Sequence, residues 1–428
     1  MNESDVDGAR VIRRAGLRII PLLGLAYLVA FMDRSNIAFA AKTMNADLGF
    51  SATVYGIGGA VFFLSYALFE IPSNILLERV GARRWIARIM ITWGLIAAAM
   101  MVVRNAWAFY AMRFLLGLAE AGFFPGVVFY LSLWFPRAER GRAISRFYIS
   151  GPLARVVMGI VSVWLLSLNG FGGLRGWQWL FLAEGLPAVV VGLLVLWLLP
   201  DRPERVTWLS DAEKGWLARR LAEDAPSARR GGLLAALRLP VVLLLGLIGG
   251  LTTMAYYTFT LSEPQILREA TGWSVASIGY LVSAGGLAGA GGMLLTGALS
   301  DRIGTRIPFL AIGAALVLIG YGAFWTRAGP VVALGGYLCY VLAWGSVTLS
   351  VWMLCTDLVN PRDMAVATAA VNTMSQAGAF VGPILWGLAR DATGAFGRGF
   401  AGLVLAQALA LGMIAVLHRL AARNKGVA

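Results

Sequence analysis

Several ionisable side chains lie inside stretches that are otherwise apolar enough to sit in lipid. Asp33 and Arg34 lie in "AYLVAFMDRSNIAFA", Arg113 and Glu120 in "AFYAMRFLLGLAEAGFFPGVVFYL", and Arg155 in "GPLARVVMGIVSVWLL". A charge at the centre of a membrane-spanning helix costs roughly 2.5–3.5 kcal/mol on insertion scales, and such residues usually face water or one another. Their presence in neighbouring segments predicts a pathway for an ion or a substrate.

Asp33 and Arg34 are adjacent, so on a helix their side chains point about 100° apart. One can face a neighbouring helix while the other faces a central cavity. We infer that Asp33 pairs with Arg113 and that Arg34 faces the substrate. The alternative is a static buried ion network that only holds helices together.

Glu120 shares one helical face with Arg113 and Gly117, because the spacing is i, i+4, i+7. Gly117 leaves room for a neighbouring helix to approach closely. No basic residue lies one turn from Glu120 on its own helix, and burial favours the neutral form of a carboxyl group. Glu120 is therefore predicted to carry a proton, with a purely structural role as the alternative.

Arg155 offers a planar guanidinium that matches a carboxylate. One hypothesis is that it gives the cavity a second cation and favours a substrate with two anionic groups. The other is that it pairs with Glu120 and is structural. Glu263, in "TLSEPQ", is expected near the external mouth, where it either tunes selectivity or forms a solvated helix end.

The elements that position these residues follow from composition. Of 428 residues, 59% are hydrophobic and only 14% are charged, whereas soluble domains are about 45–50% apolar and about 25% charged. A spanning helix needs roughly 20 apolar residues. This predicts an all-α membrane protein with twelve spans, near 18–41, 52–76, 84–104, 106–135, 140–168, 176–200, 239–262, 275–300, 306–326, 329–357, 362–390 and 396–420.

The net charge of +14 is a topology signal. With both termini inside, 26 of the 36 Lys and Arg residues fall in cytoplasmic segments, as the positive-inside rule requires. An inner-membrane location with both termini cytoplasmic is therefore expected. No interleaving of basic and aromatic residues favours nucleic acid, and no metal-ligand cluster, cofactor loop or nucleophile–base pair indicates an enzyme.

The polar stretch 201–238 divides the spans six and six. We predict a cytoplasmic tail at 1–17, a six-helix bundle at 18–200, a linker at 201–238, a second bundle at 239–420 and a tail at 421–428. Within the linker, Ser210 and Glu213 form a capping-box pattern. The helix that follows carries an apolar stripe of Leu209, Trp216, Leu217 and Leu221, which suits a membrane surface or a partner.

Two related loops mark the two halves. "G-x-x-x-D-R-x-G-x-R" occurs at Gly297–Arg306, and a variant with Asn74 for Gly and Glu78 for Asp occurs at Asn74–Arg83. The first form resembles the signature loop of the major facilitator superfamily. "FMDRSNIAFA", "RFLLGLAEAGFFPGV", "GWQWLFLAEGLPAV" and "FVGPILWGLARDATG" resemble its anion–cation symporter branch, which includes phthalate, tartrate and sugar-acid permeases.

The resemblance implies two pseudo-symmetric six-helix bundles with a substrate site between them. It implies that Glu120 and Asp33 carry protons and that Arg34 contacts a substrate carboxylate. Positions matching substrate-contacting residues of the branch are Tyr66, Trp352 and Asn372. For the two aromatic residues, ordinary helix packing is the alternative.

Charged residues of the two loops are expected to cluster at the cytoplasmic face and to act as a gate. Breaking and remaking such clusters would bias inward and outward states. Glu70, near the cytoplasmic end of its helix, is expected to be structural or part of this gate, with a proton site as the alternative. The loop residues are Glu78, Arg79, Arg83, Asp301, Arg302 and Arg306.

The sequence therefore predicts a monomeric secondary transporter that imports a small organic anion with protons. Protons serve as the coupling ion, no further cofactor is expected, and the lipid bilayer is the other partner. The alternatives are an anion exchanger or facilitator on the same fold, which has no need of Glu120, and a transporter-like sensor, which would need an added signalling segment.

Overall fold

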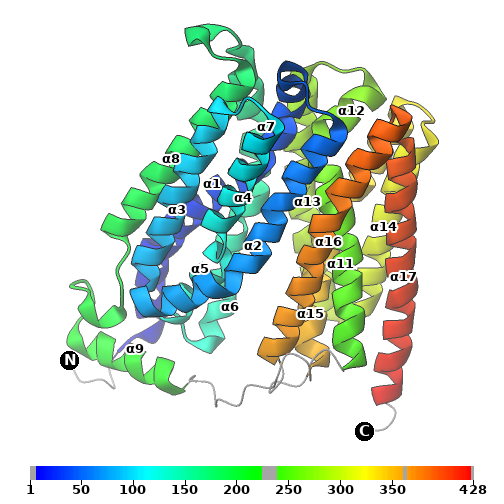
Figure 1. The fold of residues 1–428 in the computed structure, drawn as a ribbon. Helices are drawn as coiled ribbons and strands as arrows, with labels where there is room; N and C mark the ends of the chain where they lie inside the picture. Colours follow the sequence, from blue (N-terminus) through cyan, green and yellow to red (C-terminus); the bar gives the residue numbers. More distant parts are fainter. Residues whose placement is uncertain (1–5, 224–238, 360–363, 426–428) are drawn as a thin grey trace.

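The computed structural model describes residues 6–223, 239–359 and 364–425, and every regular element within these ranges is a helix (Figure 1). Parts of the predicted tails and the linker residues 224–238 lie outside them. The apolar runs form helices because a helix satisfies all its backbone hydrogen bonds internally, as lipid requires.

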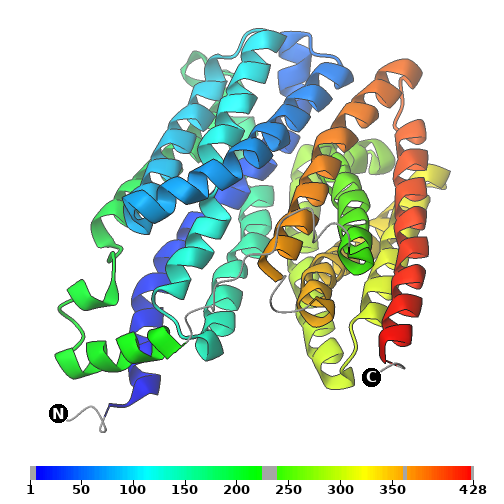
Figure 2. The same cartoon turned by 60° about the horizontal axis from the view of Figure 1, so that its bottom comes forward.

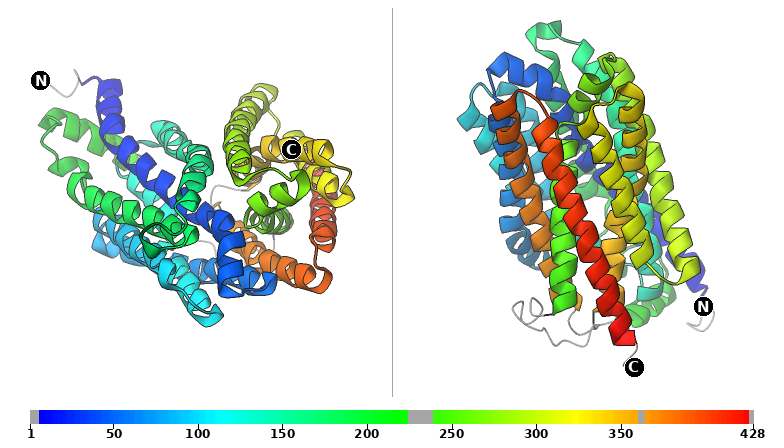
Figure 3. Two further views of the ribbon diagram at one scale, coloured as in Figure 1. Left: turned by 90° about the horizontal axis from the view of Figure 1, so that it is seen from above. Right: turned by 90° about the vertical axis from the view of Figure 1, so that its right-hand side faces the viewer.

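Two groups of helices lie side by side (Figures 1 and 3). The first group consists of α1 (Gly8–Leu48), α2 (Ala52–Val80), α3 (Ala82–Ala99), α4 (Ala106–Glu120), α5 (Phe123–Ser132), α6 (Arg137–Tyr148), α7 (Ser150–Ser167) and α8 (Gly176–Leu198). The second consists of α11 (Pro240–Thr260), α12 (Glu263–Thr271), α13 (Val275–Ile303), α14 (Ile307–Thr326), α15 (Pro330–Leu358), α16 (Met364–Thr393) and α17 (Gly397–Lys425).

Within the described ranges, eleven segments are long and apolar enough to cross a membrane. The remaining long helix, α16, carries Asn372, Thr373, Ser375 and Gln376. It nevertheless packs closely against α11 and α2. The twelve-helix fold predicted from the sequence is confirmed, although α1 is longer than the predicted span 18–41.

Three of the spans are not single helices. The fourth breaks between α4 and α5, the fifth between α6 and α7, and the seventh between α11 and α12. The sequence analysis missed these breaks, although Gly122, Pro125 and Pro264 are the kind of residues that interrupt a helix. Interrupted helices in transporters often border a binding site.

The two groups meet along three helix pairs, α2 with α16, α7 with α13, and α1 with α12. The approach of α7 to α13 is close enough to need glycine. A Cβ on Gly279 would lie 2.3 Å from the carbonyl oxygen of Gly159. Ser283 of α13 also donates a 2.8 Å hydrogen bond to the carbonyl oxygen of Val156 on α7.

The start of α1 and the end of α17 lie on one face of the molecule, together with α9 (Asp211–Glu223), and we name this the terminal face (Figures 1 and 2). The predicted capping box of α9 is confirmed. Ser210 N–H donates to Glu213 Oε2 at 2.8 Å, and Glu213 N–H donates to Ser210 Oγ at 3.3 Å.

The apolar stripe of α9 does not lie free for a membrane surface. Leu209 and Leu217 are buried in the core of the first helix group. An ion pair of 2.9 Å between Arg14 of α1 and Glu213 also fixes the helix. The stripe therefore covers the first helix group, which differs from the surface role that its pattern indicated.

Candidate functional site

Arg34 and Glu120 form the central ion pair of the site. Arg34 lies on α1, and Glu120 is the last residue of α4. Arg34 Nε donates a hydrogen bond to Glu120 Oε1 at 2.6 Å. The Glu120 side chain is only 1% exposed, whereas that of Arg34 is 22% exposed. Within the described part of the chain, Glu120 Oε2 has no hydrogen-bond partner. The guanidinium thus faces open space while the carboxylate is sealed.

The break after α4 sets the position of Glu120. Gly122 adopts φ +85°, which leaves the carbonyl of Ala121 outside the helical ladder. Ser73 of α2 donates a 2.6 Å hydrogen bond to that carbonyl, and Trp85 Nε1 donates to Ser73 Oγ at 3.0 Å. Because the freed carbonyl is satisfied, the chain can turn directly after the buried carboxyl group.

The predicted ion pair between Asp33 and Arg113 is wrong. Asp33 accepts hydrogen bonds from Asn36 Nδ2 at 3.1 Å and from Trp93 Nε1 at 3.0 Å. Arg113 Nε donates to the carbonyl of Gly58 at 3.2 Å, and its guanidinium lies 4.6 Å from the Phe62 ring centroid. Both residues are buried, and these hydrogen bonds join each of them to neutral groups.

Asp33, Arg34 and Arg113 nevertheless line one cavity between the helix groups. Its apolar walls come from both groups and include Phe62, Phe63, Tyr256 and Tyr257. A cavity that combines aromatic walls with a few convergent charges is typical of a small-molecule site. The sequence analysis missed Tyr256, whose ring stacks on Trp344 at 3.8 Å between centroids.

The three positions taken from the family resemblance have different surroundings. The Tyr66 ring centroid lies 5.2 Å from the Arg34 guanidinium carbon. Asn372 Nδ2 donates to Glu70 Oε2 at 2.9 Å, which joins α16 to α2. Trp352 is partly buried and packs against the core of the second group.

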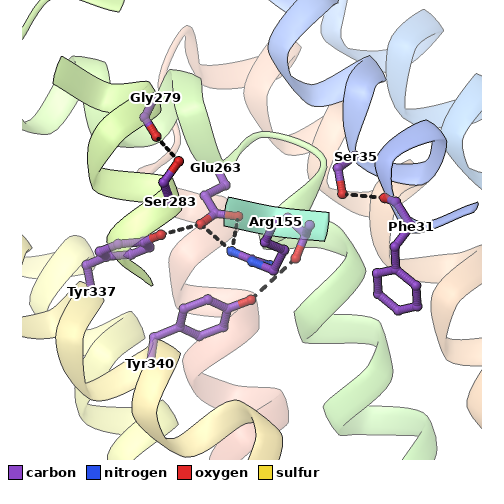
Figure 4. Close-up of polar contacts among 9 residues, drawn as sticks. Phe31, Ser35, Arg155, Glu263, Gly279, Ser283, Tyr337 and Tyr340 are labelled. Carbon is purple, nitrogen blue, oxygen red and sulfur yellow. Dashed lines mark hydrogen bonds and ion pairs between the residues drawn. The ribbon is translucent and has the colours of Figure 1, made fainter. Parts of the chain in front are cut away.

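Arg155 has a partner that the sequence analysis did not consider. Its Nη2 donates to both carboxylate oxygens of Glu263, at 2.7 and 2.9 Å, and Tyr337 Oη donates to Glu263 Oε1 at 2.6 Å (Figure 4). Arg155 therefore does not pair with Glu120. The expectation of a solvated helix end at Glu263 is also wrong, because its side chain is 4% exposed.

Glu184 on α8 is a further buried carboxyl group that the sequence analysis did not assign to the site. It is 2% exposed and lies near Asp33 and Asn36. The sequence signal was its position within an apolar span, "FLAEGLPAV". A buried carboxyl with no cation beside it is stable chiefly in its neutral form.

The loop charges pair within their own helix groups. Arg83 lies 3.0 Å from Asp201. Arg306 pairs with Asp301 at 3.3 Å and with Asp357. Partial burial acts against the charge of Arg306, yet these two carboxylates raise its pKa above the ordinary value. Three further loop residues are exposed: Glu78, Arg79 and Arg302.

Among the described residues, no group of three or more His, Cys, Asp and Glu could hold a metal ion. The donors that converge on the cavity are guanidinium, carboxyl, hydroxyl and aromatic groups. Guanidinium groups are chemically suited to bind anions, and carboxyl groups to hold protons.

Comparison with known proteins identifies related chains. A family model described as the Major Facilitator Superfamily matches residues 23–383. A protein from Agrobacterium vitis named as a putative tartrate transporter is 41% identical over 431 residues, covering 99% of this chain and 98% of its own. A quinolone resistance transporter from Acinetobacter baumannii is 38% identical over 397 residues, covering 91% of this chain and 90% of its own.

A likeness of fold extends to solved structures. The crystal structure of a bacterial homologue of the human lysosomal transporter Spinster, in an inward-facing and occupied conformation, superimposes with a TM-score of 0.75. The match covers 94% of this chain and 96% of that one, at 17% sequence identity.

Proposed function

The chain belongs to the Major Facilitator Superfamily, and its named relatives are transporters and not enzymes. On this basis we propose that it imports a small organic anion together with protons. The observation that carries this proposal is the Arg34–Glu120 pair, in which a partly exposed guanidinium is bound to a buried carboxylate. Arg34 lines the cavity between the two helix groups, and Glu120 lies behind it.

A substrate carboxylate and Glu120 compete for the same cation. If the substrate binds Arg34, Glu120 loses its partner and would remain as an unpaired buried charge, which is strongly unfavourable. A proton taken up by Glu120 removes that charge. Anion binding and proton binding therefore favour each other, which is the thermodynamic linkage that symport requires.

Asp33 adds a second carboxyl group to the same cavity. It accepts two neutral hydrogen bonds and has no ion pair with Arg113, so it is free to change its protonation without breaking a salt bridge. We assign Asp33 the role of passing protons to and from the cavity.

The substrate class rests on the two arginines that line the cavity and on the relatives. A planar guanidinium suits carboxylates, and the protein from Agrobacterium vitis is named for tartrate. We propose carboxylates such as hydroxy acids, sugar acids or aromatic acids. Tyr257 on the cavity wall would supply both apolar area and a hydroxyl, and Tyr66 would support Arg34 from 5.2 Å away.

Alternating access follows from the contacts between the groups. Three contacts join the two groups: Asp391 with the backbone of α2, Tyr55 Oη with the carbonyl of Leu261, and Arg155 with Glu263. They lie toward the face opposite the termini. With the terminal face cytoplasmic, in the inner membrane, this is a state closed to the outside. The loop charges, paired within their own groups, would form the gate on the inside.

The test is reconstitution of the purified chain in vesicles with a panel of carboxylates and a pH-sensitive dye inside. Symport predicts that an inward proton gradient drives accumulation of one acid and that the acid drives proton entry. Exchange without protons, the alternative, predicts uptake that needs an internal anion and does not respond to the gradient. Glu120→Gln is expected to abolish gradient-driven uptake, and Glu139→Gln on exposed α6 is the matched control.

A further inference from the structure

The Arg155–Glu263 pair repeats the design of the Arg34–Glu120 pair at a second place. In both, an arginine of the first helix group is held by a carboxylate next to a helix break. In both, the guanidinium is more exposed than the carboxylate, at 22% against 1% for Arg34–Glu120 and 15% against 4% for Arg155–Glu263.

The Arg155 guanidinium has spare binding capacity. An arginine has five N–H donors, and only Nη2 contacts Glu263. Glu263 does not use the donors on Nε and Nη1, and the Arg155 side chain lines a cavity together with Ser35, Thr260 and Glu263. A second carboxylate can therefore reach this cation from the cavity side.

The two arginine sites are neighbours. Ser35 of α1 and Thr260 of α11 line both the cavity that contains Arg34 and the cavity that contains Arg155. Ser35 follows Arg34 directly in the chain, and Thr260 Oγ1 lies 3.3 Å from Tyr340 Oη. Two cations with hydroxyl groups between them match a dicarboxylate that carries hydroxyls on its central carbons.

We propose that Arg155 and Glu263 form a second carboxylate subsite with its own proton acceptor, so that the transporter carries a dicarboxylate with two protons. This rests on the proposed function and extends it. One substrate carboxylate binds Arg34 and the other binds Arg155. Each displaced glutamate takes one proton from water on the loading side, and each returns it when its arginine is restored.

The net charge of each site stays the same throughout this cycle. Without substrate, each site holds one guanidinium and one carboxylate and is neutral. With a dianion and two protons, each site holds one guanidinium, one substrate carboxylate and one neutral carboxyl group. Because the net charge of the cavity is unchanged, the loaded protein meets no added electrostatic barrier when the groups move.

The groups that face Glu263 allow such a change. Arg155 comes from α7, and Tyr337 and Tyr340 from α15. Tyr256 of α11 and Tyr321 of α14 lie in the same region. Arg155 is the only cation among these named neighbours of Glu263, so the loss of Arg155 to a substrate leaves only neutral hydroxyls. The pair also joins the two helix groups, so it must break whenever the groups separate there.

The test measures uptake and proton stoichiometry in vesicles for succinate and tartrate against lactate and gluconate. Two protons per dicarboxylate and one per monocarboxylate are expected for the natural chain. In the variant Arg155→Gln/Glu263→Gln, which stays neutral, dicarboxylate uptake should fall at least tenfold relative to monocarboxylate uptake. The control is Arg220→Gln/Glu223→Gln, which removes an exposed pair of the same types on α9.

An unchanged ratio of dicarboxylate to monocarboxylate uptake in the double variant would overturn the second subsite while leaving the proposed symport intact. One proton per dicarboxylate in the natural chain would do the same. Absence of proton-linked uptake for any carboxylate would instead reject the proposed function itself.

Tyr337→Phe gives an independent readout if the double variant does not fold. It keeps both charges and removes one hydrogen bond that stabilises ionised Glu263. The Arg155–Glu263 pair is then held less strongly against a competing substrate carboxylate, so the KM of dicarboxylate uptake should fall, while that of monocarboxylate uptake should not. Equal shifts for both classes, or none, would contradict the proposal.

Discussion

Asp391 of α16 caps the first turn of α2, a helix of the other group. Its two carboxylate oxygens accept hydrogen bonds from the backbone N–H of Ala52 at 2.9 Å and of Thr53 at 2.8 Å. The N-terminus of a helix favours negative charge. The contact therefore stabilises the state in which the two groups meet at the face opposite the termini.

Asp391→Ala should shift the protein toward the state that is open at this face. The lost cap is worth about 1 kcal/mol, roughly a fivefold change in the equilibrium. Accessibility labelling of a cysteine placed among the first residues of α2 measures the shift. Asn105→Ala is the matched control, because it removes a helix cap within one group, a 2.8 Å bond from Ala108 N–H on α4. Equal labelling in both variants would contradict the prediction.

Glu120→Gln should separate proton coupling from substrate exchange. The amide can still contact Arg34, but it cannot bind or release a proton. We expect loss of gradient-driven accumulation, at least tenfold, with exchange of labelled for unlabelled substrate retained. Both rates are measured in the same vesicles. Accumulation that continues to follow the proton gradient in this variant would rule out Glu120 as the carrier.

Asn372 either links the two helix groups through its bond to Glu70 or contacts the substrate, and mutations can distinguish these two roles. If Asn372 acts only through its 2.9 Å bond to Glu70, then Asn372→Ala and Glu70→Ala should change transport alike, and the double variant should add nothing. A double-mutant cycle on the apparent affinity for substrate measures this. A larger loss for Asn372→Ala alone would instead show that the amide contacts substrate.

Arg155→Gln alone should destabilise the chain more than removal of the whole pair. It leaves Glu263 buried with Tyr337 as a hydrogen-bond donor and no cation, so the carboxyl group must either stay charged or take up a proton, and breaking a buried pair in this way costs about 3–5 kcal/mol. Arg155→Gln/Glu263→Gln should recover most of the loss. Thermal unfolding in detergent at neutral pH gives the comparison, and equal melting temperatures for the single and double variants would refute it.

Glu184→Gln should leave the fold intact or slightly more stable. The amide resembles the neutral carboxyl form that burial favours, and no cation is left without a partner. Thermal unfolding at pH 6 and pH 8 should show a smaller pH dependence than in the natural chain. A loss of stability in this variant would mean that Glu184 is ionised in the folded protein.

The sequence was sufficient for the helices because long apolar runs have one stable form in lipid. It was also sufficient to place Arg34, Arg113, Glu120 and Arg155 within spans, since charges stand out against apolar neighbours. Asp33 was predicted at the same site and does line the cavity with Arg34.

The pairings could not be read from the sequence. Glu263 is separated from Arg155 by 108 positions and Arg34 from Glu120 by 86. Which carboxylate meets which cation depends on where the helices break, and helical spacing assumes that they do not. Glu263 looked solvated because it precedes Pro264, yet the break turns it inward against Tyr337.

Tyr55 and Ser73 lie at opposite ends of α2, and each hydroxyl contacts the backbone of a different interrupted span: Tyr55 the carbonyl of Leu261, and Ser73 the carbonyl of Ala121. Leu261 lies two residues before Glu263, and Ala121 follows Glu120 directly. A single tilt of α2 would therefore pull on the backbone beside both acidic side chains at once. One continuous helix would thus link the two carboxyl groups that we propose exchange protons, without direct contact between them.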